Sequence, residues 1–138
     1  MAAILIVLSF ITLFIYGFME MTRVKFVADW DPKVAFEGLV CDPMPESVSN
    51  IHARGIIMFT GGSASIRFEI SPEDVDKLIE DGEFRPIGGG LPDWLREKHP
   101  DFNTDNAMRL RRGDREMDDI ILYICGDRTK CWFVASYM

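Results

Sequence analysis

The sequence predicts an α+β protein in which an N-terminal transmembrane helix precedes a mainly antiparallel sheet with one or two packed helices. Three observations indicate this: an uncharged apolar run over 2–19, segments in which apolar and polar residues alternate, and one helix with clear start and stop signals. Strands do not alternate regularly with long helices, so a parallel sheet is not expected. We expect an anchor at 1–20 and a single α+β domain at 21–138.

Charge is unevenly distributed along the 138 residues. The first 19 residues carry no charged side chain, so all 22 acidic and 15 basic residues lie in the remainder. This division argues against a multi-pass membrane protein and against a long disordered chain. The net charge of −7 also argues against nucleic acid as a partner, because domains that bind nucleic acid are usually basic.

The apolar run over 2–19 has the length of a membrane-spanning helix. Eighteen helical residues cover about 27 Å, close to the thickness of a hydrocarbon core of about 30 Å. Phe14, Tyr16 and Phe18 lie at its C-terminal end, where aromatic residues favour the membrane interface. A cleaved secretory signal is the alternative, but it needs a preceding basic region and a small-residue cleavage site, and neither is present. We therefore expect an uncleaved anchor that contacts membrane lipid.

Two features give opposite predictions for the side of the membrane. Arg23, Lys25 and Lys33 follow the anchor and no basic residue precedes it, which favours a cytoplasmic domain. Cys125 and Cys131 flank a predicted hairpin loop over 126–130. Directly opposed residues of antiparallel strands lie close enough for a disulfide, and disulfides persist in oxidising compartments.

We expect this disulfide, and with it a single-pass inner-membrane protein whose domain faces the periplasm. Cys41 would then remain as an unpaired thiol. The alternative is that Cys125 and Cys131 are reduced and buried as small apolar residues. In that case a cytoplasmic regulator tethered to the membrane becomes the better interpretation.

The helix over 72–81 carries the clearest local signals in the chain. Ser71 suits the N-cap position, Pro72 suits the first helical position, and Gly82 follows the last turn. Apolar residues at helical spacing should form its buried stripe: Val75, Leu78 and Ile79. Shorter helices are expected at 33–39 and 91–98, the first of them within a loop-rich stretch over 29–50.

The strands are predicted from alternation and from β-branched and aromatic content. They lie at 22–28, 51–60, 65–70, 107–112, 119–125 and 131–138. Gly61, Gly62 and Ser63 should form the turn between the second and third strands. The last two strands should form a hairpin.

No pattern in the chain identifies a catalytic or metal site. His52 and His99 lie in different predicted elements, and no zinc, calcium or phosphate-loop motif is present. We expect no catalytic residue, no bound metal and no cofactor. Both histidines are interpreted as surface or structural residues.

Two charge clusters are candidate surfaces for binding a partner protein. The acidic cluster, on or beside the predicted helix, consists of Glu73, Asp74, Asp76, Glu80, Asp81 and Glu83. The basic cluster consists of Arg109, Arg111, Arg112 and Arg115. The commoner explanation for such runs is a solvated helix face and an exposed strand edge. Trp94 is the candidate anchor residue at an interface, although a place in the core is the commoner fate of tryptophan, and Trp132 is expected in the core.

A weak resemblance covers about 30 residues. It consists of Pro45-x-Ser47-Val48-x-Asn50-Ile51, then 66–69 (IRFE), then 71–73 (SPE). This pattern resembles small uncharacterised bacterial lipoproteins and membrane-anchored domains, and the resemblance implies a compact α+β domain outside the inner membrane. The chain has no cysteine directly after the apolar run, so lipidation is not implied.

These observations predict a single-pass, membrane-anchored module of the bacterial envelope that binds one protein partner. An immunity protein and an accessory subunit of an envelope complex are two versions of this function. The alternative is an envelope enzyme that uses Asp and Glu residues for acid–base chemistry. A concave pocket holding two carboxylates with shifted pKa values would favour the enzyme.

Overall fold

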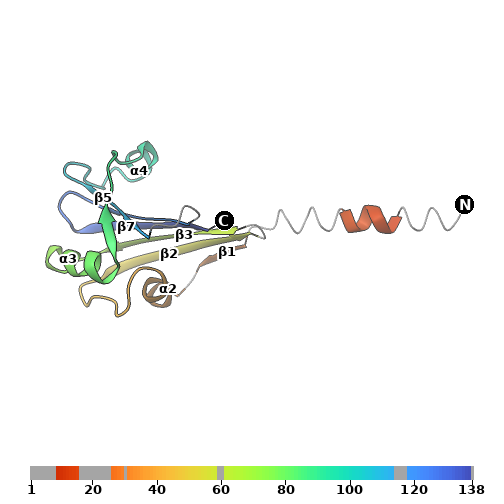
Figure 1. The fold of residues 1–138 in the computed structure, drawn as a ribbon, viewed down its shortest axis with the longest axis horizontal. Coiled ribbons are helices and arrows are strands. Elements are labelled where there is room, and N and C mark those ends of the chain that lie inside the picture. The colour runs from red at the N-terminus through yellow and green to blue at the C-terminus, as the bar shows by residue number, and fades with distance from the viewer. Residues whose placement is uncertain (1–8, 16–25, 30, 59–60, 114–117, 138) are drawn as a thin grey trace, which may run out of the picture.

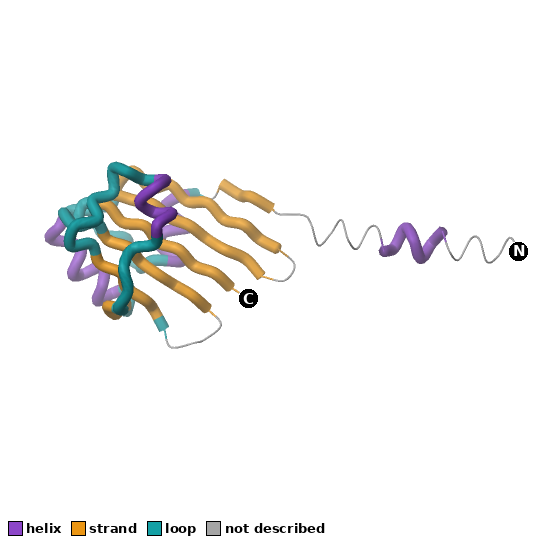
Figure 2. Tube along the Cα trace, turned by 90° about the horizontal axis from the view of Figure 1, so that it is seen from above, coloured by secondary structure: helices purple, strands orange, loops and turns teal. Residues whose placement is uncertain are grey.

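A computed structural model describes residues 9–15, 26–29, 31–58, 61–113 and 118–137. Within these ranges the chain forms an α+β domain, as predicted. Its seven strands make one sheet in the order β1-β2-β3-β7-β6-β5-β4, and every neighbouring pair is antiparallel. Figure 2 shows the strands side by side, with β1 at one edge.

Six strands were predicted, and each corresponds to an observed strand of at least four residues at approximately the same position. Their bounds are β1 Phe26–Asp29, β2 Ser49–Met58, β3 Gly61–Glu69, β4 Phe84–Pro86, β5 Met108–Arg112, β6 Asp118–Ile124 and β7 Lys130–Tyr137. The sequence did not predict β4, which has only three residues. Gly61 and Gly62 were predicted as a turn, but they begin β3 instead and pair with Met58 and Ile57.

The predicted helices are present and lie on both sides of the sheet. They are α2 Pro32–Leu39, α3 Pro72–Asp81 and α4 Asp93–Lys98. Figure 1 shows α2 and α3 on one side of the sheet and α4 on the other. We call the side covered by α2 and α3 the inner face and the side carrying α4 the outer face.

The start of α3 differs in one detail from the prediction. Ser71 occupies the N-cap position in an extended conformation, but its side chain makes no capping hydrogen bond. The Ser47 hydroxyl instead accepts a hydrogen bond from the backbone N–H of Ser71 at 3.2 Å and donates one to Asp74 at 2.5 Å. A residue from a distant loop therefore satisfies this helix terminus.

The principal core lies between the inner face and the helices α2 and α3. Phe36 of α2 packs edge-on against Phe68 of β3, with ring centroids 4.9 Å apart. Leu78 of α3, Leu122 of β6 and Phe133 of β7 are fully buried in the same cluster. A smaller cluster under α4 covers part of the outer face and includes Leu95, Phe102, Tyr123 and Cys125.

The predicted membrane segment lies mostly outside the described residues. Residues 9–15 are helical, and nothing is described on either side of them up to residue 26. In the part of the chain that the structure describes, no helix is long and apolar enough to cross a membrane.

The predicted Cys125–Cys131 disulfide is wrong. Ile124 pairs with Cys131, and the N–H of Cys125 donates to the carbonyl of Lys130 at 3.0 Å. The two cysteines are therefore out of register by one residue, and side chains of a strand alternate between faces. Cys131 packs in the inner core and Cys125 under α4, and all three cysteines are free and buried.

Candidate anion-binding groove

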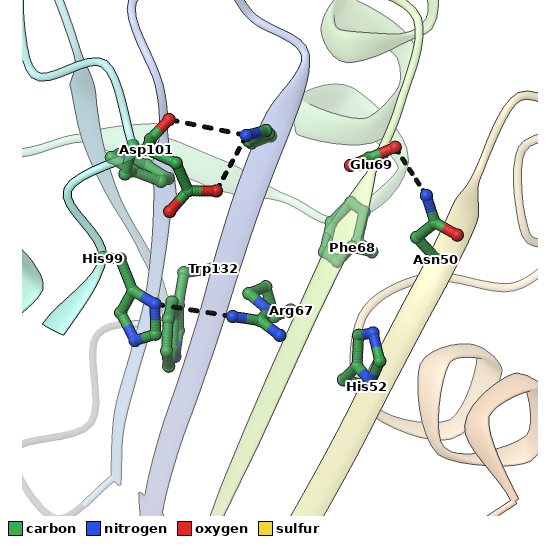
Figure 3. Close-up of a pocket in the computed structure, with 10 residues that line it drawn as sticks. Asn50, His52, Arg67, Phe68, Glu69, His99, Asp101 and Trp132 are labelled. Carbon is green, nitrogen blue, oxygen red and sulfur yellow. Dashed lines mark hydrogen bonds and ion pairs between the residues drawn. The ribbon is translucent and has the colours of Figure 1, made fainter.

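Alternation in three neighbouring strands places a set of polar and aromatic side chains on the outer face. In β3, Ile66 and Phe68 are buried in the inner core, so Arg67 between them points outward. The register aligns His52 of β2, Arg67 of β3 and Trp132 of β7 in one row across the sheet. Figure 3 shows this row, with His99 beside Trp132.

This row forms the floor of a groove that extends along the strands. The C-terminal end of α4 makes its wall, through Lys98 and His99. We call this hollow the outer groove and divide it into two halves that share the row and His99. The basic half has a volume of about 600 Å³ and the paired half about 220 Å³.

The described residues that line the basic half include cations and no acidic residue. Arg54, Arg67 and Lys98 supply three positive charges, and Ile56 supplies an apolar surface. Arg67 and Lys98 take part in none of the ion pairs formed among the described residues. Arg54 lies opposite Asp29 in the register. We therefore attribute the capacity of this half to bind an anion to Arg67 and Lys98. These charges are concentrated in a protein whose net charge is −7.

The shared centre of the groove is held by ring contacts and hydrogen bonds. Trp132 donates its indole N–H to the hydroxyl of Ser65 at 2.9 Å, and the His99 ring lies 4.0 Å from the Trp132 ring. The Arg67 guanidinium lies 5.8 Å from the same ring and 3.4 Å from Nδ1 of His99. Because arginine can only donate, Nδ1 accepts and neutral His99 carries its proton on Nε2.

The charge state of His99 follows from the same contacts. Burial lowers the pKa of His99, and the neighbouring positive charge of Arg67 lowers it further. The imidazole is therefore neutral at pH 7 and gains its positive charge only in acid. An anion bound beside Arg67 would oppose this shift.

The paired half contains two carboxylates, and each has a partner. Lys130 donates to Asp101 at 2.8 Å, and Asn50 donates to Glu69 at 2.7 Å (Figure 3). The hydrogen bond from Lys130 lowers the pKa of Asp101, and the same bond raises the pKa of Lys130. A general acid at neutral pH needs a carboxyl whose pKa is raised, so the shift at Asp101 is in the opposite direction.

The described part of the chain holds no group of three or more His, Cys, Asp or Glu residues that could bind a metal ion. The side chains of Arg67 and Lys98 in the basic half suit the binding of an anion by charge and hydrogen bonding.

The predicted acidic cluster lies on α3 and just beyond it, on the opposite side of the sheet from the outer groove (Figure 1). Two of its members are engaged within the domain: Asp74 accepts from Ser47, and Asp76 forms an ion pair with Arg128. The other four are exposed: Glu73, Glu80, Asp81 and Glu83.

The predicted basic cluster is divided by the pleat of β5. Arg109 and Arg111 belong to the outer face, and Arg111 forms an ion pair with Asp119 at 3.2 Å. Arg112 belongs to the inner face. Arg115 lies outside the described residues.

The Arg112 guanidinium is half-buried at the ends of two helices. It donates to the carbonyls of Gly82, after α3, at 2.5 Å, and of Leu39, the last residue of α2, at 2.6 Å. It also donates to the carbonyl of Val40 and lies 4.4 Å from the ring centroid of Phe84. These contacts give Arg112 a role within the fold.

Trp94 lies on α4 next to the groove. Its ring makes edge-on contacts with Trp132 at 5.6 Å and with Tyr123 at 6.0 Å, and 37% of the residue is exposed. Trp132 was expected in the core, but it is half-buried on the outer face because Cys131 and Phe133 on either side of it fill the inner core.

Sequence reasoning did not find the residues of the groove. His52 and His99 were interpreted as surface or structural, and Arg67 was not singled out as a binding residue. The alternation in β3 and β7 was a usable signal for the outward direction of Arg67 and Trp132. Their assembly into one site depends on the strand order, which the sequence did not provide.

Comparisons with known proteins add no relative to this picture. No protein family, no curated protein and no solved structure matches the chain.

Proposed function

We propose that this chain is a membrane-tethered binding module that recognises an anionic ligand in the outer groove. The observation that carries this proposal is the basic half of the groove, which combines Arg67, Lys98 and His99 and has no carboxylate among the described residues of its lining. In a domain of net negative charge, a local positive potential of this kind attracts and orients anions. An acidic segment of a partner protein is one ligand of this class.

The tether is proposed from the apolar run over 2–19. Without a disulfide between Cys125 and Cys131, the argument for an oxidising compartment disappears. Arg23 and Lys25, directly after the run, then favour a domain on the cytoplasmic side. Retention of the full chain in membranes after alkaline carbonate washing supports the tether, and release of the chain argues against it.

Binding is favoured over acid–base catalysis. The paired half of the groove is a concave site with two carboxylates, Glu69 and Asp101. The pKa of Asp101 is lowered, so this group holds no proton to donate at neutral pH. Asp101 instead forms an ion pair with Lys130 beside the proposed binding site.

The test is a titration of the full chain, in a neutral detergent, with two simple anions: pyrophosphate and a hexaglutamate peptide. Trp132 lies in the groove floor, so tryptophan fluorescence reports on the occupancy of the groove. We expect saturable binding of at least one anion that weakens with added salt. Arg67→Gln should weaken it about tenfold, which corresponds to about 1.4 kcal/mol.

Arg85→Gln is the matched control, because Arg85 is exposed on β4 and lies outside the groove while the change in net charge is the same. If neither anion binds, or if both variants weaken binding equally, the groove is not an anion site.

A further inference from the structure

We propose that the ligand of the outer groove is the phosphate-bearing headgroup of an anionic lipid in the membrane to which the chain is tethered. This inference rests on the proposed function and names its ligand. It combines the chemistry of the basic half, the position of that half within the sheet, and the length of chain between the domain and the anchor.

The chemistry of the basic half suits a phosphodiester. Arg67 on β3 and Lys98 at the end of α4 line this half, so they would approach the negative charge of a bound phosphodiester from two elements. Guanidinium and ammonium groups are the side chains that most often bind phosphate oxygens. The hydroxyl of Ser63 lies in the same lining and can donate to a further phosphate oxygen.

The size of the basic half favours a headgroup over a protein segment. Its volume of about 600 Å³ lies within the range of sites for small molecules. A stable protein interface usually buries more than about 1,000 Å². A charged group with a short apolar portion fills this half, with the apolar portion against Ile56.

The basic half lies toward the end of the sheet at which β1 begins. The lining residues Ile56 and Ser63 pair with each other across β2 and β3, and Ile56 pairs with Val27 of β1. β1 begins one residue earlier, at Phe26. The groove therefore extends from the carboxylates of the paired half toward the end of the sheet where the chain arrives from the anchor.

The length of the intervening chain limits the distance to the membrane. Seven residue steps separate residue 19, the end of the apolar run, from Phe26. At about 3.3–3.6 Å per step, these residues span at most about 25 Å. A domain on the cytoplasmic side would meet a leaflet rich in anionic lipid, which attracts basic surfaces.

The experiment uses the full chain in a neutral detergent and short-chain lipids that dissolve in water. Dihexanoyl phosphatidylglycerol is titrated, and the tryptophan fluorescence of the protein, to which Trp132 in the groove contributes, is followed. Dihexanoyl phosphatidylcholine tests the need for net negative charge, and glycerol phosphate tests whether a free phosphate ester is sufficient. The hexaglutamate peptide represents an acidic protein segment.

We expect phosphatidylglycerol to bind about tenfold more tightly than each of the three other probes. Arg67→Gln and Lys98→Gln should each weaken its binding about tenfold, whereas Arg85→Gln should leave it unchanged. Two groove variants are used because both side chains are solvent-exposed and lie on different elements, so a folding defect in one would not affect the other.

Other outcomes overturn the inference in distinguishable ways. Tighter binding of hexaglutamate, sensitive to Arg67→Gln, would show that the groove takes an acidic protein segment, and the proposed function would survive. Equal binding of glycerol phosphate would assign the groove to a free phosphate ester. Equal binding of the two lipids would show that the groove does not select for the net negative charge of the headgroup. Absence of binding by every anion would refute both the inference and the proposed function.

Discussion

Replacement of Arg112 by glutamine should destabilise the domain more than any other single change at an arginine. The guanidinium donates three hydrogen bonds to carbonyls, those of Leu39, Val40 and Gly82. These carbonyls lie at the C-terminal ends of α2 and α3 or one residue beyond, where helix dipoles place partial negative charge. The positive charge of Arg112 is thus balanced by helix termini.

The magnitude follows from these contacts. A hydrogen bond from a charged donor contributes about 1.5–3 kcal/mol when buried, and we take about 1 kcal/mol for each bond here because Arg112 is half-exposed. The contact with Phe84 adds about 0.5 kcal/mol. Arg112→Gln should therefore lower the free energy of unfolding by about 3.5 kcal/mol. Arg112→Lys keeps the charge but cannot reach carbonyls of both helices, so we expect a loss of about 2 kcal/mol.

The assay is urea unfolding of the full chain in a neutral detergent, followed by tryptophan fluorescence. With a slope of about 1.5 kcal/mol/M, the glutamine variant should unfold at a urea concentration about 2 M lower. Arg96→Gln on the exposed surface of α4 is the control and should change stability by less than about 0.5 kcal/mol. If Arg112→Gln is as stable as this control, the two helix ends do not depend on the guanidinium and the reasoning is wrong.

Four further results are expected. The three cysteines should be alkylated in urea without reductant, giving three adducts by mass spectrometry; fewer adducts would indicate a disulfide. Leu122→Ala should lower the free energy of unfolding by about 3 kcal/mol because Leu122 is fully buried, and Val34→Ala, at a residue 68% exposed, should leave it nearly unchanged. The lowered pKa of Asp101 stabilises the folded state above the usual carboxyl pKa, and this stabilisation disappears as the pH falls through the lowered value; Asp101→Asn should remove that part of the stability–pH curve. Anion binding should tighten as the pH falls below the usual histidine pKa and His99 gains its proton, and His99→Gln should reduce this change, whereas an identical pH profile would exclude His99 from the site.

Local signals in the sequence predicted local structure well. The helix over 72–81 was identified with both of its bounds because proline, acidic residues and glycine mark its ends within the sequence itself. The prediction for Ser71 was less complete, since the hydroxyl that satisfies the helix terminus comes from Ser47. A contact between residues far apart in sequence leaves no such local signal.

Properties that depend on strand register were predicted poorly. Cys125 and Cys131 are separated by a register difference of one residue, which is enough to place them on opposite faces. Arg111 and Arg112 lie on opposite faces for a different reason, because adjacent side chains of one strand alternate between faces. Composition and spacing do not determine which residues face each other across a hairpin.

The outer groove could not be predicted because its parts come from β2, β3, β7 and α4. Its central row joins His52, Arg67 and Trp132, which are distant in sequence, and β7 lies beside β3 only in the folded sheet. Each residue alone had an ordinary explanation. Their shared position is the basis of the binding role proposed for them.

The short edge strand β1 has a mechanical consequence for a tethered domain. Any pull that travels along the main chain from the anchor enters the sheet at Phe26, and β1 pairs only with β2, through four residue pairs from Phe26 to Asp29. If the force exceeds what these pairs withstand, β1 separates from β2 first. The connecting segment between the proposed anchor and the sheet then becomes four residues longer. The remaining strands, the core between the sheet and the helices α2 and α3, and Arg67 at the groove would stay assembled, so a domain that is tethered and binds a ligand as proposed would keep that ligand after β1 had separated.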